Sequence, residues 1–319
     1  MILNTTGGNS FTWTGRDDTA SEGPNALRWH QRVAHYSADA AAGKVLIGFC
    51  SDEGVRRNGG RIGAAAGPEA LRSALANLAW HGASPLYDAG DIVCADGQLE
   101  VAQQALADQV ASVLRAGHQP LVMGGGHEVA WGTWQGIVAS NPHVPRIGII
   151  NVDAHFDLRQ SSQAHSGTPF AQIHRDCVAR QMPFNYLCLG VSALANTSAL
   201  FDSAKQTGTT WMLDEQFTMW NRPAVENTVA KFLGNVDLVY LTICLDAFPA
   251  SIAPGVSAPA ARGVEIDVVE WLIDLIHQRG RLHVAEIAEL NPQFDQDHRT
   301  AKLAARLLAR CAGAATPSP

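Results

Sequence analysis

The segment IGIINVDAHFDLR, residues 147–159, indicates the fold more clearly than any other part of the chain. It begins as an apolar, β-branched run, which is typical of a buried strand, and ends in Asp153, His155 and Asp157. A strand that is apolar on both faces is characteristic of a parallel sheet with helices on either side. Ligands collect at the carboxyl ends of such strands, so the three polar residues fall where a functional site is expected.

Similar apolar runs recur along the chain, with longer segments of helical periodicity between them. We expect strands at residues 44–50, 120–123, 146–152, 186–191, 209–213, 238–245 and 283–287. We expect helices at residues 68–80, 100–116, 128–139, 195–206, 223–233, 267–278 and 300–310. The alternation predicts a single three-layer α/β/α domain over residues 1–319 with a central, mostly parallel sheet, and only the ends, about 1–14 and 312–319, are expected to fray.

The composition is that of a folded protein that acts on a small molecule. The 319 residues are 46% hydrophobic and 17% charged, and the net charge is −7, so a large core can form and nucleic acid is not an expected partner. No apolar run approaches the ~18 residues of a membrane span, and the first residues do not resemble a signal peptide. No two of the six cysteines have CxxC spacing. We therefore expect a cytoplasmic protein with no membrane partner.

The segment PLVMGGGHE, residues 120–128, ends a predicted strand in three glycines. It is neither a dinucleotide-binding motif, since Val129 stands where that motif has glycine, nor a P-loop, since no GK[ST] follows. The glycines allow a sharp turn that places His127 at the edge of the sheet. On this segment alone, His127 could be a ligand, a capping residue or a core histidine.

The alternation Asp-x-His-x-Asp at Asp153, His155 and Asp157 directs three side chains toward one point if the chain stays extended. Burying two adjacent carboxylates without a counter-charge is costly, and a divalent cation commonly supplies that charge. A solvated strand end is the alternative. In LVYLTICLDAFPASIAPG, residues 238–255, Cys244 and Asp246 end another apolar strand, although a lone aspartate there could be only a helix cap.

Taken together, these residues form a set of oxygen and nitrogen ligands. Carboxylates with imidazole suit manganese better than structural zinc, which favours tetrahedral cysteine and histidine sites. The number of carboxylates indicates two ions, between which a bridging hydroxide would serve as nucleophile.

The chain resembles the arginase, or ureohydrolase, family. The resemblance rests on GGGH, then DAHFD, then a strand with two metal-binding positions before an APG segment, in that order. The segments TWTGRDD, RIGAAAGPEALR, HEVAWGTWQG, LCLGVSALANTSALFD, APGVSAPAARG and AELNPQFDQDHRTAKLAA are similar to one branch, the formimidoylglutamases of histidine degradation. This likeness extends over most of the chain.

The resemblance implies a two-Mn²⁺ hydrolase that converts N-formimidoyl-L-glutamate and water to L-glutamate and formamide. One ion would be held by His127, Asp153 and Asp157. The other would be held by Asp153, His155 and Asp246. Asp157 would also orient the nucleophile and move its proton to the departing amine, and Glu289 in ELNP would receive the cationic amidine. Members of the family are usually oligomeric, so we expect a homo-oligomer.

Two positions depart from the family pattern. Ser166 stands where arginases carry a proton-shuttling histidine, with His165 one position away, which favours the formimidoylglutamase branch. Cys244 stands where the family has an aspartate that bridges both ions. A thiolate is a softer ligand, so manganese should bind more weakly there, and occupancy of the second site depends on this residue.

The two carboxylates of formimidoylglutamate need cationic partners. Arg159 and Arg262 are the candidates, because a guanidinium group pairs bidentately with a carboxylate; Arg61 is a weaker one. Two alternatives stay open. The chain could be another ureohydrolase, acting on a guanidino acid or agmatine, or a family-shaped protein whose activity is weakened by Cys244.

Overall fold

The computed structural model describes residues 11–141 and 146–315. In them, nine parallel strands form one sheet in the order β1-β3-β2-β4-β9-β8-β5-β6-β7. The strands are β1 (Val33–His35), β2 (Lys44–Cys50), β3 (Leu86–Val93), β4 (Gln119–Met123), β5 (Ile147–Val152), β6 (Asn185–Val191), β7 (Thr210–Leu213), β8 (Leu238–Cys244) and β9 (Leu282–Ala288). The expected mostly parallel sheet is confirmed.

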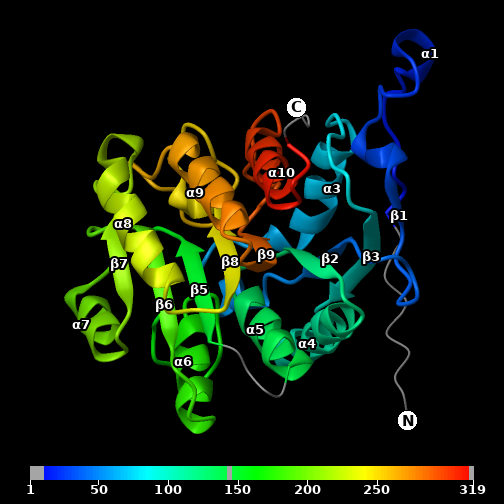
Figure 1. Ribbon diagram of the computed structural model, residues 1–319. Helices are drawn as coiled ribbons and strands as arrows, with labels where there is room; N and C mark the ends of the chain where they lie inside the picture. The colour runs from blue at the N-terminus through cyan, green and yellow to red at the C-terminus, as the bar shows by residue number, and fades with distance from the viewer. Residues whose placement is uncertain (1–10, 142–145, 316–319) are drawn as a thin grey trace, which may run out of the picture.

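Helices cover both faces of the sheet (Figure 1). The α-helices are α1 (Thr19–Glu22), α2 (Glu53–Arg57), α3 (Gly67–Ala76), α4 (Leu99–Arg115), α5 (Val129–Ser140), α6 (Pro169–Ala179), α7 (Ser198–Gln206), α8 (Arg222–Leu233), α9 (Ile266–Gln278) and α10 (Arg299–Cys311). Short 3-10 helices are η1 (Trp29–Gln31), η2 (Ala64–Ala66), η3 (Met219–Asn221) and η4 (Leu245–Ala247). Helices α3, α8, α9 and α10 lie on one face, and α4, α5, α6 and α7 on the other. This is the three-layer α/β/α arrangement expected from the sequence.

Each face of the sheet buries its own apolar core. Alternate residues of β8 belong to different cores. Leu241 and Ile243 belong to the core under α9 and α10. Tyr240 belongs to the core under α4 and α5. The central strands are therefore apolar on both sides, as strands between two helical layers must be.

The sequence did not predict every element. Strands β1 and β3 and helices α1, α2 and α6 were not expected. The helix expected at 68–80 ends at Ala76, because the next residues pair with the N-terminal segment instead: Trp29 N donates to Leu78 O (3.0 Å) and Trp80 N to Leu27 O (2.9 Å).

The ends of the chain are described only in part, since residues 1–10 and 316–319 lie outside the described ranges. Within those ranges, Trp13 Nε1 donates a hydrogen bond to Asp88 Oδ2 (3.0 Å). At the other end, Ala312 and Ala314 are buried in the core. These parts of both ends pack against the rest of the molecule.

The strand order brings distant segments to one edge. Strands β4, β9, β8 and β5 are neighbours at the centre of the sheet. Met123 pairs with Ile287, Ile287 with Ile243, and Ile243 with Val152. The residues that follow these four therefore emerge together at the carboxyl edge, where the sequence places its polar motifs. No helix in the described part of the chain is both long and apolar enough to cross a membrane.

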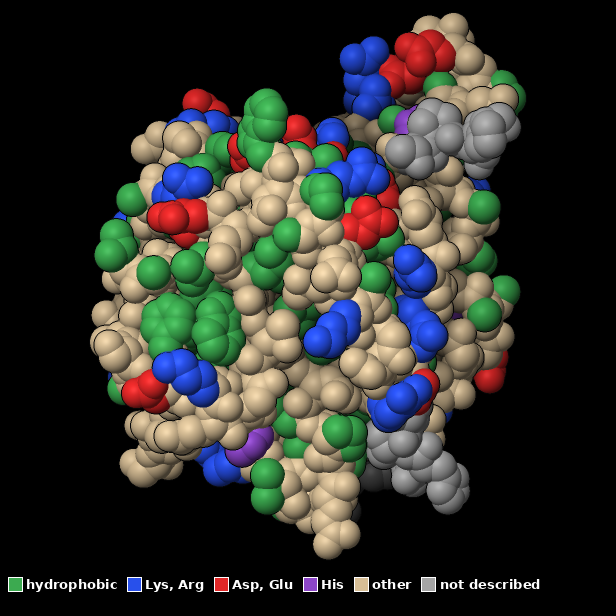
Figure 2. Space-filling model, turned by 60° about the vertical axis from the view of Figure 1, so that its left-hand side comes forward, with side chains coloured by type: hydrophobic (Ala, Val, Ile, Leu, Met, Phe, Trp, Pro, Cys, Tyr) green, Lys and Arg blue, Asp and Glu red, His purple; other side chains and the backbone are tan. Residues whose placement is uncertain are grey.

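Figure 2 shows one face of the molecule, on which basic and acidic side chains are both spread among neutral ones. Large exposed apolar side chains of the molecule include Leu194 and Trp220.

Candidate metal centre

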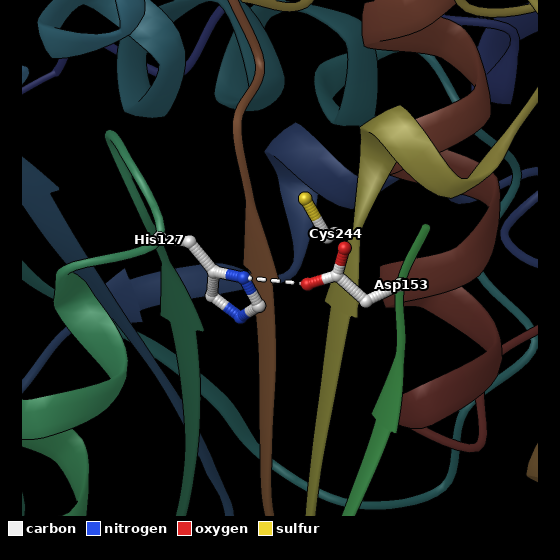
Figure 3. Close-up of side chains that lie close together, drawn as sticks. All are labelled: His127, Asp153 and Cys244. Carbon is white, nitrogen blue, oxygen red and sulfur yellow. Dashed lines mark ion pairs between the residues drawn. The ribbon is translucent and has the colours of Figure 1, made fainter. Parts of the chain in front are cut away.

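Three side chains from three strand ends converge at the carboxyl edge of the sheet (Figure 3). His127 lies in the turn after β4, Asp153 directly follows β5, and Cys244 is the last residue of β8. A ligand atom of each lies within 4.8 Å of the others. His127 Nδ1 is 2.9 Å from Asp153 Oδ2. The structure therefore brings these three segments together, as expected, and places the Cys244 thiol beside the other two side chains.

The glycine turn explains how His127 reaches this place. Gly126 N donates to Ser51 O (2.9 Å) and Glu289 N to Gly125 O (2.8 Å), so the turn is pinned between two neighbouring segments. A Cβ atom on Gly125 would lie 1.7 Å from Ser51 O, so the backbones can approach this closely only with glycine. His127 N then donates to Glu289 Oε1 (3.0 Å).

A second group shares Asp153 with the first. It consists of Asp153, His155 and Asp246, whose ligand atoms also lie within 4.8 Å of one another. His155 Nδ1 lies 3.2 Å from Asp246 Oδ2 and 3.5 Å from Asp153 Oδ1. One carboxylate thus stands between two sets of ligands, as a bridging residue would.

Asp157 adjoins the first group. Its Oδ2 lies 3.1 Å from His127 Nδ1. Its backbone has a φ of 48°, a conformation that is uncommon for residues other than glycine. Strand β5 ends at Val152 and the chain bends at Ala154 and His155, so the segment does not stay extended; the turn at Asp157 brings its carboxylate back toward His127.

Charges within the cluster shift the pKa values of both histidines. Burial alone would lower the pKa of His127, but Asp153 and Asp157 raise it well above its usual value. Burial would also lower the pKa of His155, but Asp246 and Asp153 raise it to about 12. In turn, the two histidines hold the pKa of Asp153 below its usual range in spite of burial. Without a metal ion, protons on the two histidines therefore supply the positive charge that a cation would supply.

The acidic groups around Asp153 respond in the opposite direction. Burial and the charge of Asp153 raise the pKa of Asp157 to about 6 and also raise that of Asp246. Burial and Asp246 raise the pKa of Glu289 to about 8. Burial raises the pKa of the Cys244 thiol well above its usual value. The centre therefore holds more buried acidic groups than its two histidines can keep ionised.

The buried polar atoms of the centre indicate whether a metal ion would fit there. Among the described residues, the buried Asp246 Oδ1 and Glu289 Oε2 make no hydrogen bond, and the buried His127 Nδ1 faces carboxylate oxygens of Asp153 and Asp157 at 2.9 and 3.1 Å. Buried polar atoms without partners are rare, and a bound cation is one way to satisfy them. Their chemistry, imidazole and carboxylate, is that of a Mn²⁺ site, and the thiol of Cys244 adds a softer donor. The residues present fit a divalent cation.

The centre opens into a cavity of about 350 Å³. Its walls include eight residues expected from the sequence: His127, His155, Asp157, Arg159, Ser166, Cys244, Asp246 and Glu289. Arg61 lines it too, but its guanidinium already donates to Ser257 O (2.9 Å) and lies 4.0 Å from the ring centroid of Phe294. The exposed Arg159 makes no side-chain hydrogen bond or ion pair that involves a described residue, and is the freer cation.

Arg262 does not line this cavity. It lies with Asp214 in a neighbouring cavity of about 440 Å³, which shares His155 and Ala258 with the first. The two expected carboxylate partners, Arg159 and Arg262, thus line different cavities, both of which include His155.

Two asparagines in the cavity wall were not singled out from the sequence. Asn58 Nδ2 donates to Ser166 Oγ (3.1 Å). Asn196 Oδ1 accepts from Phe156 N (3.2 Å), and its Nδ2 donates to Ala154 O (2.9 Å), so it fastens the segment that carries His155. Both lie in irregular segments, where no periodic pattern marks them.

The doubly covered parallel sheet and the cluster of histidines and carboxylates at its carboxyl edge together define an α/β/α protein with a candidate metal centre. Comparison with known sequences identifies the family more closely. The Arginase family model matches residues 42–313, and the chain belongs to the arginase family.

Relatives and solved structures agree with this assignment. A formimidoylglutamase from Chromobacterium violaceum is 56% identical over 295 residues, which cover 92% of this chain and 95% of the relative. A crystal structure of Trypanosoma cruzi formiminoglutamase with Mn²⁺ superimposes with a TM-score of 0.75 at 26% identity, covering 85% of this chain and 92% of that one. A formimidoylglutamase from Bacillus subtilis has a TM-score of 0.80 at 20% identity, covering 98% and 95%, which shows the shared fold.

Proposed function

We propose that the protein hydrolyses N-formimidoyl-L-glutamate to L-glutamate and formamide, as a step of histidine degradation. The observation that carries this proposal is the ligand cluster at the floor of a polar cavity that also holds Glu289 and Arg159. The substrate carries both a cationic amidine and anionic carboxylates, so its site needs an acidic partner for the first and a basic partner for the second. The 56% identity to a formimidoylglutamase over nearly the whole chain supports the same substrate.

The two groups of side chains described above support a proposal for the metal ligands. We propose Mn²⁺ as the natural cofactor, held in one site by His127, Asp153, Asp157 and Cys244. The second site consists of Asp153, His155 and Asp246. Two cations bound there would lower the pKa of a water molecule and offset negative charge that develops on the reacting carbon's substituents.

The chain's own residues bind the substrate and move its protons. Hydrolysis breaks the bond between the glutamate nitrogen and the formimidoyl carbon, and the departing nitrogen must gain a proton. Asp157, which faces both the cavity and His127, is the proposed carrier of that proton. Glu289 Oε2 has no partner among the described residues and accepts from the amidine N–H groups, while its Oε1 is held by His127 N.

The substrate's carboxylates have two proposed partners. Arg159 lies in the wall of the main cavity near Ser166, and Ser166 is oriented by Asn58. Arg262 lies in the adjoining cavity and would reach a carboxylate that extends past His155. A guanidinium group is suited to bidentate contact with a carboxylate.

Substrate comparison tests the proposal. We expect release of glutamate from N-formimidoylglutamate by the Mn²⁺-incubated full-length protein, and little or no urea from agmatine or a guanidino acid. Urea release with no glutamate release would favour the other ureohydrolase activity. No turnover on any of these compounds, with no manganese retained, would indicate that Cys244 has disabled the centre.

We also propose a cellular compartment and an assembly state. All six cysteines are free, and four of them are buried, which supports a reducing compartment such as the cytoplasm. A homo-oligomer is proposed from the family resemblance alone. Light scattering at several protein concentrations would measure the assembly, and a monomer throughout would contradict it.

A further inference from the structure

A row of buried polar side chains lies directly beneath the metal centre, in the central strands of the sheet. It consists of Asn151 on β5, Thr242 on β8 and Glu286 on β9, which we call the polar row. Thr242 pairs in register with Asn151 on one side and with Glu286 on the other. All three are fully buried. Asp153 and Cys244 follow Asn151 and Thr242 by two residues. Because side chains alternate along an extended chain, the polar row lies on the same face as Asp153 and Cys244.

Glu286 is surrounded by hydroxyl groups. Its Oε1 accepts hydrogen bonds from Tyr240 OH (2.6 Å) and Thr242 Oγ1 (2.9 Å), and its Oε2 accepts from Thr133 Oγ1. No Lys, Arg or His side chain of the described residues forms an ion pair with it. A buried carboxylate is costly even with three neutral donors, and an apolar residue here would fill the core more cheaply. Its presence calls for a role beyond packing.

Thr242 links this carboxylate to a metal ligand. His127 Nε2 lies 3.1 Å from Thr242 Oγ1. A threonine hydroxyl has one proton, and here that proton is donated to Glu286. The oxygen can therefore only accept from His127, which requires a proton on Nε2. The other ring nitrogen, Nδ1, is the one that faces Asp153 and Asp157.

We propose that Glu286 is a positioning residue: acting through Thr242, it keeps the proton of His127 on Nε2 and turns the ring so that Nδ1 is available to a divalent cation. Hydrogen bonding of the second ring nitrogen is a general way to fix the tautomer and orientation of a metal-binding histidine. The proton that leaves when a cation binds is then the one on Nδ1. This inference rests on the proposed metal centre.

The chain provides a matched control, because Tyr240 donates to the same oxygen of Glu286 but forms no hydrogen bond with His127. Thr242→Val removes the link with little change in volume, Thr242→Ser retains it, and Tyr240→Phe removes a hydrogen bond to Glu286 only. The readout is the Kd of the full-length protein for Mn²⁺, measured with a competing chelator. We expect about 10- to 100-fold weaker binding for Thr242→Val. Thr242→Ser should restore the wild-type Kd, and Tyr240→Phe should change it by less than about threefold.

Equal weakening of Mn²⁺ binding in Thr242→Val and Tyr240→Phe would overturn the inference, since both would then act through general destabilisation. An unchanged Kd in Thr242→Val would overturn it as well. If Thr242→Val does not fold, Glu286→Gln is measured instead: weaker binding supports the role, and wild-type binding overturns it. If the wild-type protein itself binds no Mn²⁺, the proposed metal centre fails, and this inference fails with it.

Discussion

Asp153 is the residue on which the centre depends most, because its two oxygens face different histidines. Oδ2 lies 2.9 Å from His127 Nδ1, and Oδ1 lies 3.5 Å from His155 Nδ1. Asn151 Nδ2 donates to Oδ2 (3.1 Å) and His155 N donates to Oδ1 (2.7 Å), so the carboxylate is fixed in its place before any cation binds. A carboxylate held in this way loses little freedom on binding.

Asp153→Ala should remove both metal binding and activity, because both ligand groups lose their shared member. We expect at least about a 100-fold loss of Mn²⁺ affinity and no measurable glutamate release. Metal content per chain after desalting and an activity assay measure the two effects. Asp202→Ala, a change at an exposed aspartate on α7, is the control. Full activity in the Asp153 variant would disprove the role of the metal centre.

Glu289→Gln should separate substrate binding from metal binding. The amide keeps an oxygen that can accept from His127 N, but it loses the charge that the amidine needs. We expect unchanged manganese content and a fall in kcat/KM of about 100-fold, the effect of removing one partner of a buried charge pair. Loss of manganese from this variant would show instead that Glu289 belongs to the metal site.

At the scale of elements, the turn after β4 and the end of β5 bring His127 and Asp153 together, and both could be predicted from short motifs. The central strands were predicted because their apolar runs are continuous. Strand β3 was not, because it contains Asp88 and Asp91, which are unfavourable in strands. In the structure both aspartates form ion pairs with the buried Arg72 (2.8 and 2.6 Å). A partner so distant in sequence cannot be inferred from local pattern.

The candidate site, too, could be predicted only in part from local sequence patterns. His127, Asp153, His155 and Asp246 follow apolar strands, so the rule of parallel sheets places them at one edge. Asn58 and Asn196 reach the cavity from irregular segments. Their positions depend on tertiary hydrogen bonds rather than on a repeating pattern.

Gly125→Ala should disrupt the turn after β4. The new Cβ would lie 1.7 Å from Ser51 O, so the turn must move away from β2 and carry His127 with it. We expect a loss of about 1–3 kcal/mol in the free energy of unfolding, measured with urea, together with weaker Mn²⁺ binding. Gly234→Ala is a suitable control, since its Cβ would have only ordinary contacts at 3.5 Å. Equal stability of the two variants would contradict the proposed reason for glycine at 125.

At the scale of the whole molecule, the charges at the centre link stability to pH. In the metal-free protein the pKa of Glu289 is about 8 and that of Asp157 is about 6, both raised chiefly by burial. Between pH 4 and pH 8 the folded state therefore binds protons that the unfolded chain has lost. His155, whose raised pKa is due to Asp246 and Asp153 in spite of burial, acts in the same direction, since its stabilisation is lost as pH rises.

Metal-free protein should accordingly become less stable as pH rises from about 5 to 8, as measured by urea unfolding in the presence of a chelator. With saturating Mn²⁺ the dependence should reverse, because binding displaces protons and becomes tighter at higher pH. A rise in stability with pH in the metal-free protein would show that the buried charge of the centre does not control this balance.

The strand order also has a consequence for synthesis of the chain. Strand β9, near the C-terminus, lies between β4 and β8 at the centre of the sheet. Until residues 282–288 leave the ribosome, the nascent chain cannot join its two halves, and the edges of β4 and β8 stay unpaired. Unpaired strand edges are prone to wrong association. We therefore expect a nascent chain of this protein to need protection, by the ribosome or by chaperones, until β9 has been made.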